Sequence, residues 1–348
     1  MFVKRKLGRQ NLLLFFLLIA GFLIGMPTIL AFTLGNNLPP EVPVALYRPQ
    51  LRPGGPLLTF AQRGPTLDIH VLPHDEDSWD LQDDLLLLRL HNAEALPSYR
   101  GEGWLDQNVQ YKLEDGLFIL VLKVDNLPPV FRIAKRDNRY SIIWSEPGLS
   151  GKRIAIDPGH GGHDPGAEGL FLREKDITLA IGLELQQLLQ QAGAEVFMTR
   201  STDTLVDTAL EPGKHIRPDL WKRQRIVEEW DPDFFISIHN NSWIDRKVGG
   251  IETYYNPHSF NRALNCRAAQ LIQARLVEAI GRKDRGIRYK ENSDAVLQTA
   301  NYPSALAEIL YISNRAEEAI LAEPDFPQKA AQGLFLGISD YFSGGEER

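Results

Sequence analysis

The chain reads RIAIDPGHGGHDPG over residues 153–166, a short apolar strand followed at once by a glycine-rich loop. Residues 175–192 come next and place apolar side chains every three or four positions, which predicts an amphipathic helix. The alternation then continues, with strands predicted at 195–200, 234–239, 251–255 and 305–312, and helices near 220–230, 262–280 and 328–342. Strands that alternate with helices predict an α/β domain over 151–345, in which helices flank a mostly parallel, twisted sheet.

Residues 44–148 show a different pattern, of short segments that are rich in aliphatic and aromatic side chains and separated by turn residues. No long amphipathic helix is evident among them. The clearest such segments are 85–92, 108–115, 117–124 and 140–144. We therefore expect a smaller all-β domain, a sandwich or a barrel, in front of the α/β domain.

The N-terminus carries an apolar run, LLLFFLLIAGFLIGMPTILAF over residues 12–32, which follows four basic residues. A bilayer span needs ~20 apolar residues and a cleavable signal core only ~7–15. We expect a signal peptide or transmembrane anchor over 1–35 and an extended linker over 36–43, with a buried helix of a soluble domain as the alternative. By the positive-inside rule the chain after Phe32 is exported to the periplasm or cell envelope. If the segment is not cleaved, residues 12–32 anchor the chain in the cytoplasmic membrane.

The composition excludes some classes of function. The 348 residues include 45 acidic and 38 basic side chains, a net charge of -7 at pH 7. That sign gives no general attraction to nucleic acid, so we expect no nucleic-acid partner. A single cysteine, Cys266, excludes an intrachain disulfide and a multi-cysteine metal site.

Two histidines follow predicted strands, which is where open α/β sheets bind their ligands. His160 lies in the glycine-rich loop, and His239 ends the strand at 234–239. Glu174, at the start of the long helix, adds a carboxylate. Two imidazoles and a carboxylate that leave one position open to water form a catalytic zinc set. The separations of 14 and 65 residues are not a short metal-binding motif, so structural histidines and a helix-dipole role for Glu174 stay open as alternatives.

Glu308 interrupts the otherwise apolar stretch SALAEILYIS at 304–313. A buried carboxylate is costly unless it has a partner or a task. The residues alone leave two roles open, one half of a buried salt bridge or a general base beside a metal-bound water.

Six stretches of the chain resemble, in order and spacing, the zinc-dependent N-acetylmuramoyl-L-alanine amidases with an amidase-3 type catalytic domain. They read IAIDPGHGGHDPGA, LREKDITLAI, FFISIHNN, GGIETYY, DRGIRY and ALAEILYISN, and the resemblance covers about residues 152–345. It implies that His160, Glu174 and His239 hold Zn²⁺ and that Glu308 is the catalytic glutamate. It also implies cleavage of the amide between the lactyl group of N-acetylmuramic acid and L-alanine in peptidoglycan.

The same family pattern favours His160 over its neighbour His163 as the zinc ligand. It also includes Arg285, in DRGIRY, as a catalytic-site residue that orients substrate or a carboxylate, with a solvated surface arginine as the alternative. Leu310 and Tyr311 stand where the family commonly has Gly-Phe, which alters the packing beside the catalytic glutamate.

The β-rich domain resembles, in its placement only, the cell-wall-targeting AMIN domains of related amidases, and a spacer is the alternative. Residues 207–218 lack the long helical insertion with which division-associated relatives block their own sites, so we do not expect that self-inhibition. The expected partners are peptidoglycan, the membrane through the N-terminal segment, and an activator protein if the enzyme requires one. Two competing hypotheses are a non-catalytic wall-binding or septal scaffold that keeps the amidase fold, and a metallohydrolase of the same fold that acts on another amide or on small muropeptides.

Overall fold

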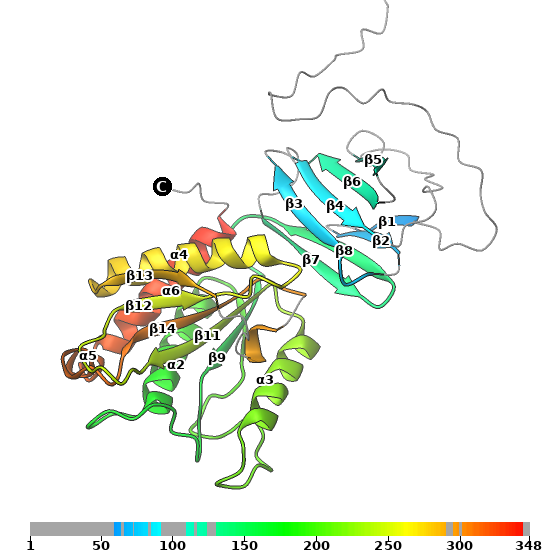
Figure 1. Cartoon of the computed structure of the whole chain (residues 1–348). Coiled ribbons are helices and arrows are strands. Elements are labelled where there is room, and N and C mark those ends of the chain that lie inside the picture. The colour runs from blue at the N-terminus through cyan, green and yellow to red at the C-terminus, as the bar shows by residue number, and fades with distance from the viewer. Residues whose placement is uncertain are drawn as a thin grey trace, which may run out of the picture. The chain divides into compact units, whose positions relative to one another are not determined.

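The computed structural model describes residues 59–63, 66–71, 73–82, 85–91, 109–114, 117–123, 130–289, 295–298 and 301–343 (Figure 1). All of these belong to one compact unit of the chain, Pro49–Arg348. The predicted signal or anchor at 1–35 and the predicted linker at 36–43 lie outside the described residues. Within the described ranges, no helix is both long and apolar enough to cross a membrane.

A six-stranded sheet forms the centre of the C-terminal part. Its strands, in spatial order, are β10 (Glu195–Met198), β9 (Arg153–Pro158), β11 (Phe234–Asn241), β14 (Ser304–Tyr311), β12 (Ile251–Tyr254) and β13 (Asp284–Arg288). Neighbouring strands are parallel except β12 and β14. The sheet is therefore mixed but mostly parallel, as predicted, with the single antiparallel pairing between β12 and β14. The connection from β11 to β12, residues 242–250, is shorter than the roughly dozen residues that a parallel crossover needs, so β12 runs in the opposite direction.

Helices flank this sheet on both faces, as predicted (Figure 1). They are α2 (Glu174–Gln191), α3 (Arg217–Trp230), α4 (Arg262–Ile280), α5 (Arg315–Leu321) and α6 (Phe326–Phe342), with a short 3-10 helix, η1 (Ala295–Leu297). Helices α2, α4 and α6 pack into one hydrophobic cluster with Ile154 and Ile156 of β9, whereas α3 packs with Ala155 on the other face. Because successive strand residues point to opposite faces, β9 is buried on both sides.

In the α/β part, strand β13 and helix α5 are absent from the predictions above, as is the short η1. Strand β13 reads DRGIR and offers no apolar alternation. Helix α5 has seven residues, and its first turn is capped by Asn314, whose side chain accepts hydrogen bonds from two backbone N–H groups of that turn. Both elements are too short for hydrophobic periodicity to reveal them.

The described residues between 59 and 145 form antiparallel strands. They are β1 (Thr59–Arg63), β2 (Thr66–His70), β3 (Ser78–Gln82), β4 (Leu85–Leu90), β5 (Val109–Glu114), β6 (Leu117–Lys123), β7 (Val130–Arg136) and β8 (Arg139–Ser145). They build two four-stranded sheets, β1-β2-β8-β7 and β3-β4-β6-β5. Ile69 and Ile133 of the first sheet share one hydrophobic cluster with Leu88 and Leu120 of the second. This arrangement is a β-sandwich, and each of the four segments noted in the sequence carries a strand.

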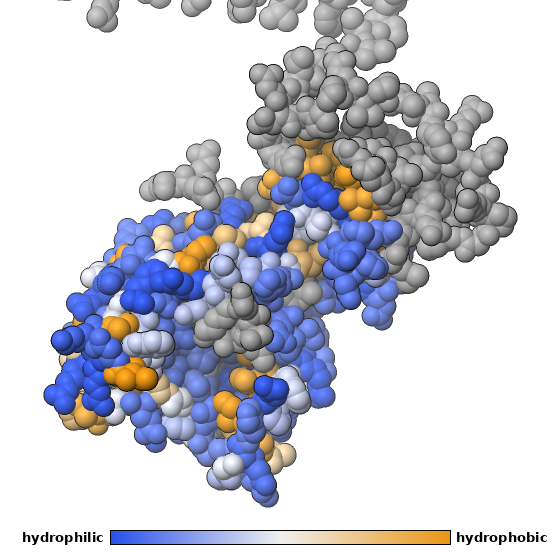
Figure 2. Space-filling model, viewed as in Figure 1, coloured by the Kyte–Doolittle hydropathy of each residue, from blue (hydrophilic) through white to orange (hydrophobic). Residues whose placement is uncertain are grey.

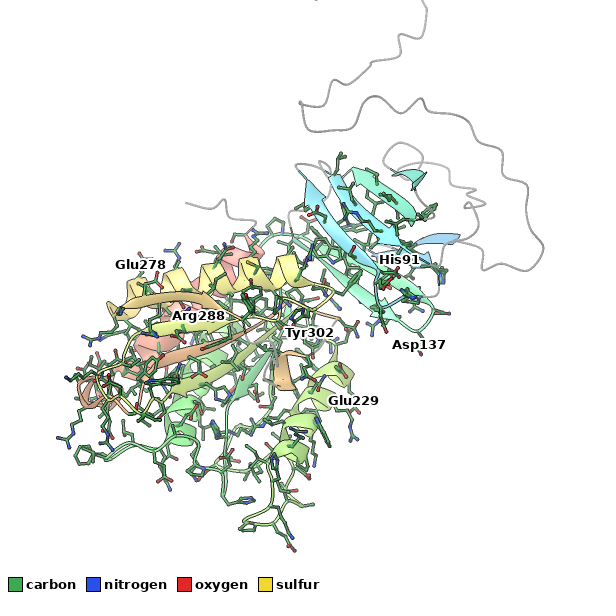
Figure 3. All side chains as sticks on the ribbon, viewed as in Figure 1. His91, Asp137, Glu229, Glu278, Arg288 and Tyr302 are labelled. Atoms are coloured by element: carbon green, nitrogen blue, oxygen red, sulfur yellow. The ribbon has the colours of Figure 1, made fainter. Side chains whose placement is uncertain are left out.

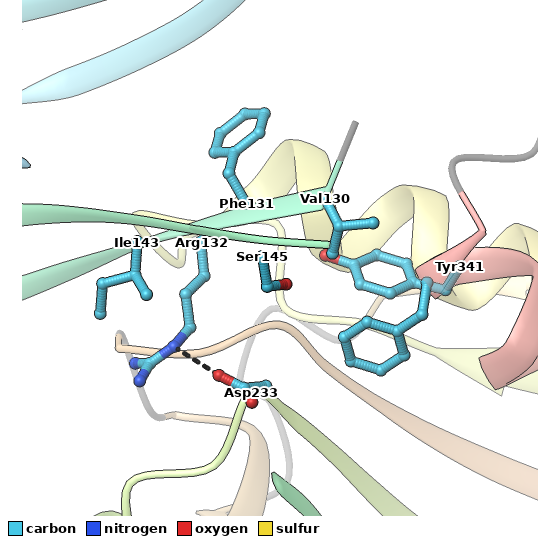
Figure 4. A pocket seen from close by; sticks show the side chains of 8 residues that line it. Val130, Phe131, Arg132, Ile143, Ser145, Asp233 and Tyr341 are labelled. Atoms are coloured by element: carbon cyan, nitrogen blue, oxygen red, sulfur yellow. Dashed lines mark hydrogen bonds and ion pairs between the residues drawn. The ribbon is translucent and has the colours of Figure 1, made fainter. Parts of the chain in front are cut away.

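The sandwich contacts the α/β part through basic side chains of β7 (Figure 4). Arg132 donates hydrogen bonds to Asp231 at 3.0 Å and to Asp233 at 3.3 Å, and Arg136 donates to Asp231 at 2.9 Å. A cavity of about 10 Å³ beside Arg132 has room for no more than about one water molecule. Asp233 directly precedes β11, so these contacts lie at the amino ends of the central strands, away from their carboxyl ends.

Candidate active site

The structure brings His160, Glu174 and His239 together at the carboxyl edge of the central sheet. His160 follows β9, His239 lies near the end of β11, and these two strands are parallel neighbours whose carboxyl ends therefore meet. One ligand atom from each of the three residues lies within 4.8 Å of the others. Nε2 of His160 is 3.2 Å from Glu174 Oε2, and Nδ1 of His239 is 2.9 Å from Glu174 Oε1.

Backbone groups hold the Glu174 carboxylate in place. The N–H of Ala167 donates to Oε2 at 2.8 Å, and the N–H of Asn240 donates to Oε1 at 2.9 Å. Burial by itself would raise the pKa of Glu174, but hydrogen bonds from His160 and His239 and their charges hold that pKa well below its usual range. The side chain is therefore a fixed, ionised acceptor.

A neighbouring carboxylate orients the imidazole of His160. Its Nδ1 lies 2.8 Å from Asp164 Oδ2, which leaves Nε2 directed toward Glu174. Burial would lower the pKa of His160, but hydrogen bonds to Asp164 and Glu174 raise it to about 10. His163, the alternative in the same loop, is exposed and does not join the group.

Two glycines let the loop pack directly against these side chains. A Cβ added at Gly159 would lie 2.3 Å from Cε1 of the His239 ring. At Gly166, where φ is +67°, it would lie 2.6 Å both from Glu174 Oε2 and from His160 Cδ2. The glycine-rich loop thus brings backbone into van der Waals contact with all three candidate ligands.

Arg223 of α3 binds the backbone of the glycine-rich loop that carries His160. The sequence reasoning missed this residue. Its guanidinium is fully buried and forms ion pairs with Asp157 at 2.8 Å and Asp219 at 2.7 Å. It also donates to the backbone carbonyls of Pro158 at 2.9 Å and His160 at 2.6 Å. The i, i+4 spacing of Asp219 and Arg223 was the available signal, but such pairs are ordinary on exposed helix faces.

A second buried arginine, Arg200, binds the same loop and was also missed. It follows β10 and donates to the carbonyls of Pro158 and Gly159, both at 2.8 Å. It also donates to the carbonyl of Lys175, in the first turn of α2, at 2.8 Å. One guanidinium therefore ties the His160 loop to the helix that begins with Glu174.

Glu308 lies on β14, beside the centre. In the sheet it is paired with His239 of β11 on one side and with Glu252 of β12 on the other. Paired residues of neighbouring strands share a face, so the side chains of Glu308 and the candidate ligand His239 project from the same face of the sheet at neighbouring positions.

Arg285 of β13 forms an ion pair with Glu252, one strand beyond Glu308. The hydroxyls of Tyr254 and Tyr311 also donate to Glu252, at 2.7 and 3.1 Å. Burial would raise the pKa of Glu252, but the hydrogen bonds from Arg285 and the two tyrosines hold it below its usual value. Sequence reasoning missed Glu252, which is the carboxylate that pairs with Arg285.

The two residues that depart from the family pattern have visible structural consequences. Tyr311 supplies one of the hydroxyls on Glu252, which a phenylalanine could not. Leu310 has a φ of 64°, a left-handed conformation that favours glycine, and its side chain is fully buried in the main core. Backbone strain of about 1–2 kcal/mol is thus offset by apolar burial.

Two surface loops of the α/β part expose large apolar side chains. Leu170 and Phe171 lie between the glycine-rich loop and α2, and Trp243 and Ile244 follow β11. A cavity of about 190 Å³ is lined by Leu170, Trp243 and Ile244 among others, but by none of the three candidate ligands. On the face shown in Figure 2, hydrophilic residues predominate and the hydrophobic patches are separate.

Comparison with known proteins identifies relatives of the α/β part. A sequence model of the family described as N-acetylmuramoyl-L-alanine amidase (Amidase_3) matches residues 154–340. The germination-specific N-acetylmuramoyl-L-alanine amidase of Bacillus subtilis (strain 168) is 36% identical over 207 residues, which cover 58% of this chain and 83% of the relative. The B. subtilis N-acetylmuramoyl-L-alanine amidase LytC is 30% identical over 221 residues, 60% of this chain and 42% of LytC.

A solved structure shares the fold. The CwlD amidase from Clostridioides difficile, in complex with the GerS lipoprotein, is 29% identical with a TM-score of 0.52, and the match covers 56% of this chain and 99% of CwlD. The family match begins at the second residue of β9 and ends in α6, so it contains the central sheet except Arg153 and spans more than half of the 348 residues. This chain therefore belongs to the N-acetylmuramoyl-L-alanine amidase family.

Proposed function

We propose that this chain is a zinc-dependent N-acetylmuramoyl-L-alanine amidase that hydrolyses the amide between N-acetylmuramic acid and L-alanine in peptidoglycan. One observation carries the proposal: His160, Glu174 and His239, far apart in sequence, present ligand atoms within 4.8 Å of one another. Family membership supplies the class of reaction, the hydrolysis of a cell-wall amide.

The donor set fits zinc. Two imidazole nitrogens and one carboxylate oxygen are ligands that catalytic zinc sites use, with a fourth position left for water. Asp164 behind His160, and two backbone N–H groups on Glu174, are outer contacts of the kind that orient metal ligands. The two carboxylates that stabilise a proton on His160 would equally stabilise a dication in its place.

A zinc ion held there would supply Lewis-acid activation of a water molecule and of the amide carbonyl. Glu308, paired with His239 in the sheet, would accept the proton of the attacking water. The same carboxyl group would return that proton to the nitrogen of L-alanine as the C–N bond breaks. Arg285 would act as a positioning residue: by pairing with Glu252 it neutralises the carboxylate next to Glu308 and limits the repulsion between them.

The remaining parts of the chain fit an enzyme of the cell envelope. The predicted N-terminal segment would export the protein to the periplasm or cell envelope and, if uncleaved, anchor it in the cytoplasmic membrane. The sandwich would bind the wall, as AMIN-like domains do, or act as a spacer. The relative CwlD is described in complex with a lipoprotein, which supports testing this chain for an activating partner as well.

The test is to incubate the full chain, purified in mild detergent, with intact peptidoglycan and to identify the new ends by mass spectrometry. Free amino termini on L-alanine together with unsubstituted lactyl carboxylates are the expected products. They should disappear with a chelator and return with Zn²⁺. Cleavage of a glycan or peptide bond instead would overturn the proposal.

The competing function is a wall-binding or septal scaffold without activity. Replacing Glu308 by Gln separates the two, because it removes the proton acceptor and keeps the shape of the side chain. If the chain is an amidase, Glu308→Gln abolishes product while sedimentation with peptidoglycan persists. If it is a scaffold, wild type and variant bind equally and neither releases product, even from soluble muropeptides with zinc supplied.

A further inference from the structure

A second group of metal-ligating side chains lies in the β-sandwich, apart from the amidase centre. His74 and Glu76 belong to the connection between β2 and β3, and His91 directly follows β4 (Figure 3). One ligand atom from each of these three residues lies within 4.8 Å of the others. Oε2 of Glu76 is 3.7 Å from Nε2 of His91, and the two imidazole rings are 5.4 Å apart between centroids.

A buried carboxylate, Asp77, holds both histidines. Its Oδ2 accepts hydrogen bonds from the backbone N–H of His74 at 2.7 Å and from the hydroxyl of Tyr140 at 2.5 Å. Its Oδ1 accepts from the backbone N–H of His91 at 2.8 Å and lies 3.2 Å from Nδ1 of the same ring. Nε2 of His91 is thereby directed toward Glu76, the carboxylate–histidine arrangement found behind metal ligands.

Two further contacts, one of His74 and one of Lys135, bear on whether a metal ion can bind here. The backbone N–H of Glu76 donates to Nδ1 of His74 at 3.2 Å, and this exposed bond must be released, or the ring turned, for His74 to bind a metal. The nearby cation, Lys135, pairs with Asp75 at 3.3 Å, so part of its charge is neutralised. Glu76 and Asp77 supply two negative charges to balance a dication.

We propose that His74, Glu76 and His91 form a second metal site, for Zn²⁺ or another borderline divalent transition ion. Two imidazoles and one carboxylate favour such an ion over Mg²⁺ or Ca²⁺, which prefer oxygen ligands. The site spans both sheets, since Glu76 lies in the connection that leaves β2 and His91 follows β4, while Tyr140 of β8 holds Asp77. A bound ion would join the two sheets and stabilise the sandwich.

The experiment measures zinc bound to the full, metal-free chain after dialysis against buffered free Zn²⁺. We expect two ions per chain in the wild type, one in His91→Ala, one in His239→Ala and none in the double variant. The second ion should bind more weakly, because the Glu76 side chain is 74% exposed whereas Glu174 is buried. His70→Ala, a histidine of β2 outside the group, is the matched control and should retain two.

Two further measurements guard against misfolding. His74→Gln should lose the same ion as His91→Ala, and circular dichroism should match wild type in both. Zinc should raise the unfolding temperature of His239→Ala but not that of the double variant. If the wild type holds one ion, which His91→Ala loses and His239→Ala keeps, the second site is supported and only the proposed zinc site of the amidase centre is contradicted. Retention of two ions by His91→Ala, or a single wild-type ion lost in His239→Ala, would overturn the second site.

Discussion

The contact between Gly159 and His239 predicts a large loss of activity from a single added methyl group. An alanine Cβ at position 159 would lie 2.3, 2.5 and 2.7 Å from Cε1, Nε2 and Nδ1 of the His239 ring. Unbonded carbon atoms pack at about 3.5–4.0 Å, so the imidazole must move by about 1 Å. The backbone itself tolerates alanine, because φ at Gly159 lies outside the left-handed region.

The size of that displacement sets the expected magnitude. A misplacement of about 1 Å in a catalytic constellation costs about 100-fold in rate. Shifting a metal ligand through its outer contacts weakens metal affinity by about 10–100-fold. We therefore expect Gly159→Ala to lower kcat/KM on peptidoglycan by about 100-fold and to raise the Kd for zinc by at least about tenfold.

The assay pairs release of dye-labelled peptidoglycan with zinc competition against a chromophoric chelator. Gly193→Ala is the matched control: its φ is +85°, so alanine is strained, but the added Cβ meets only Ser150, at 3.4 Å. It precedes β10 at the amino edge of the sheet and should cost about 1–2 kcal/mol of stability with zinc affinity unchanged. If Gly159→Ala stays within about threefold of wild type in both measurements, His239 is not positioned by this contact and the reasoning fails.

Three further predictions follow from named contacts. Arg223→Met should cost about 3–5 kcal/mol in urea unfolding, because Asp157 would be left buried and unpaired; a loss below about 1 kcal/mol would contradict this role. Leu310→Gly should be more stable than Leu310→Ala by about 1 kcal/mol, because both lose the buried side chain and only glycine relieves the φ of 64°. The reverse order of unfolding temperatures would exclude strain at this residue. A hydrogen bond from Lys175 lowers the pKa of Asp203, so its contribution to stability is present above the unfolded pKa of about 3.9 and is lost as pH falls through the lower folded value. In Asp203→Asn, the unfolding temperature should therefore fall less steeply than in the wild type as the pH is lowered from about 5 to 3. An unchanged slope would mean that other carboxylates cause the decrease.

Local sequence signals were enough for the α/β class and suggested three candidate metal ligands, and the resemblance to the amidase family then favoured the metal role over a structural one. Strand and helix periodicities are short-range. His160 follows one apolar strand and His239 lies near the end of another, and the carboxyl ends of these two neighbouring parallel strands meet. Glu174 could be added to the candidate ligands because it begins the helix that follows the glycine-rich loop of His160. The role of these residues and the identity of the metal stay predictions until zinc is measured.

Only the tertiary structure decided the features that depend on pairing between distant segments. The antiparallel β12–β14 pairing, the Arg285–Glu252 ion pair and the contacts of Arg223 with the His160 loop join elements whose separation along the chain says nothing about distance in space. The same is true of His74 and His91, which come together because buried Asp77 binds both backbones. Periodicity reports which face of an element is buried, whereas the partner across that face is set by how the elements pack.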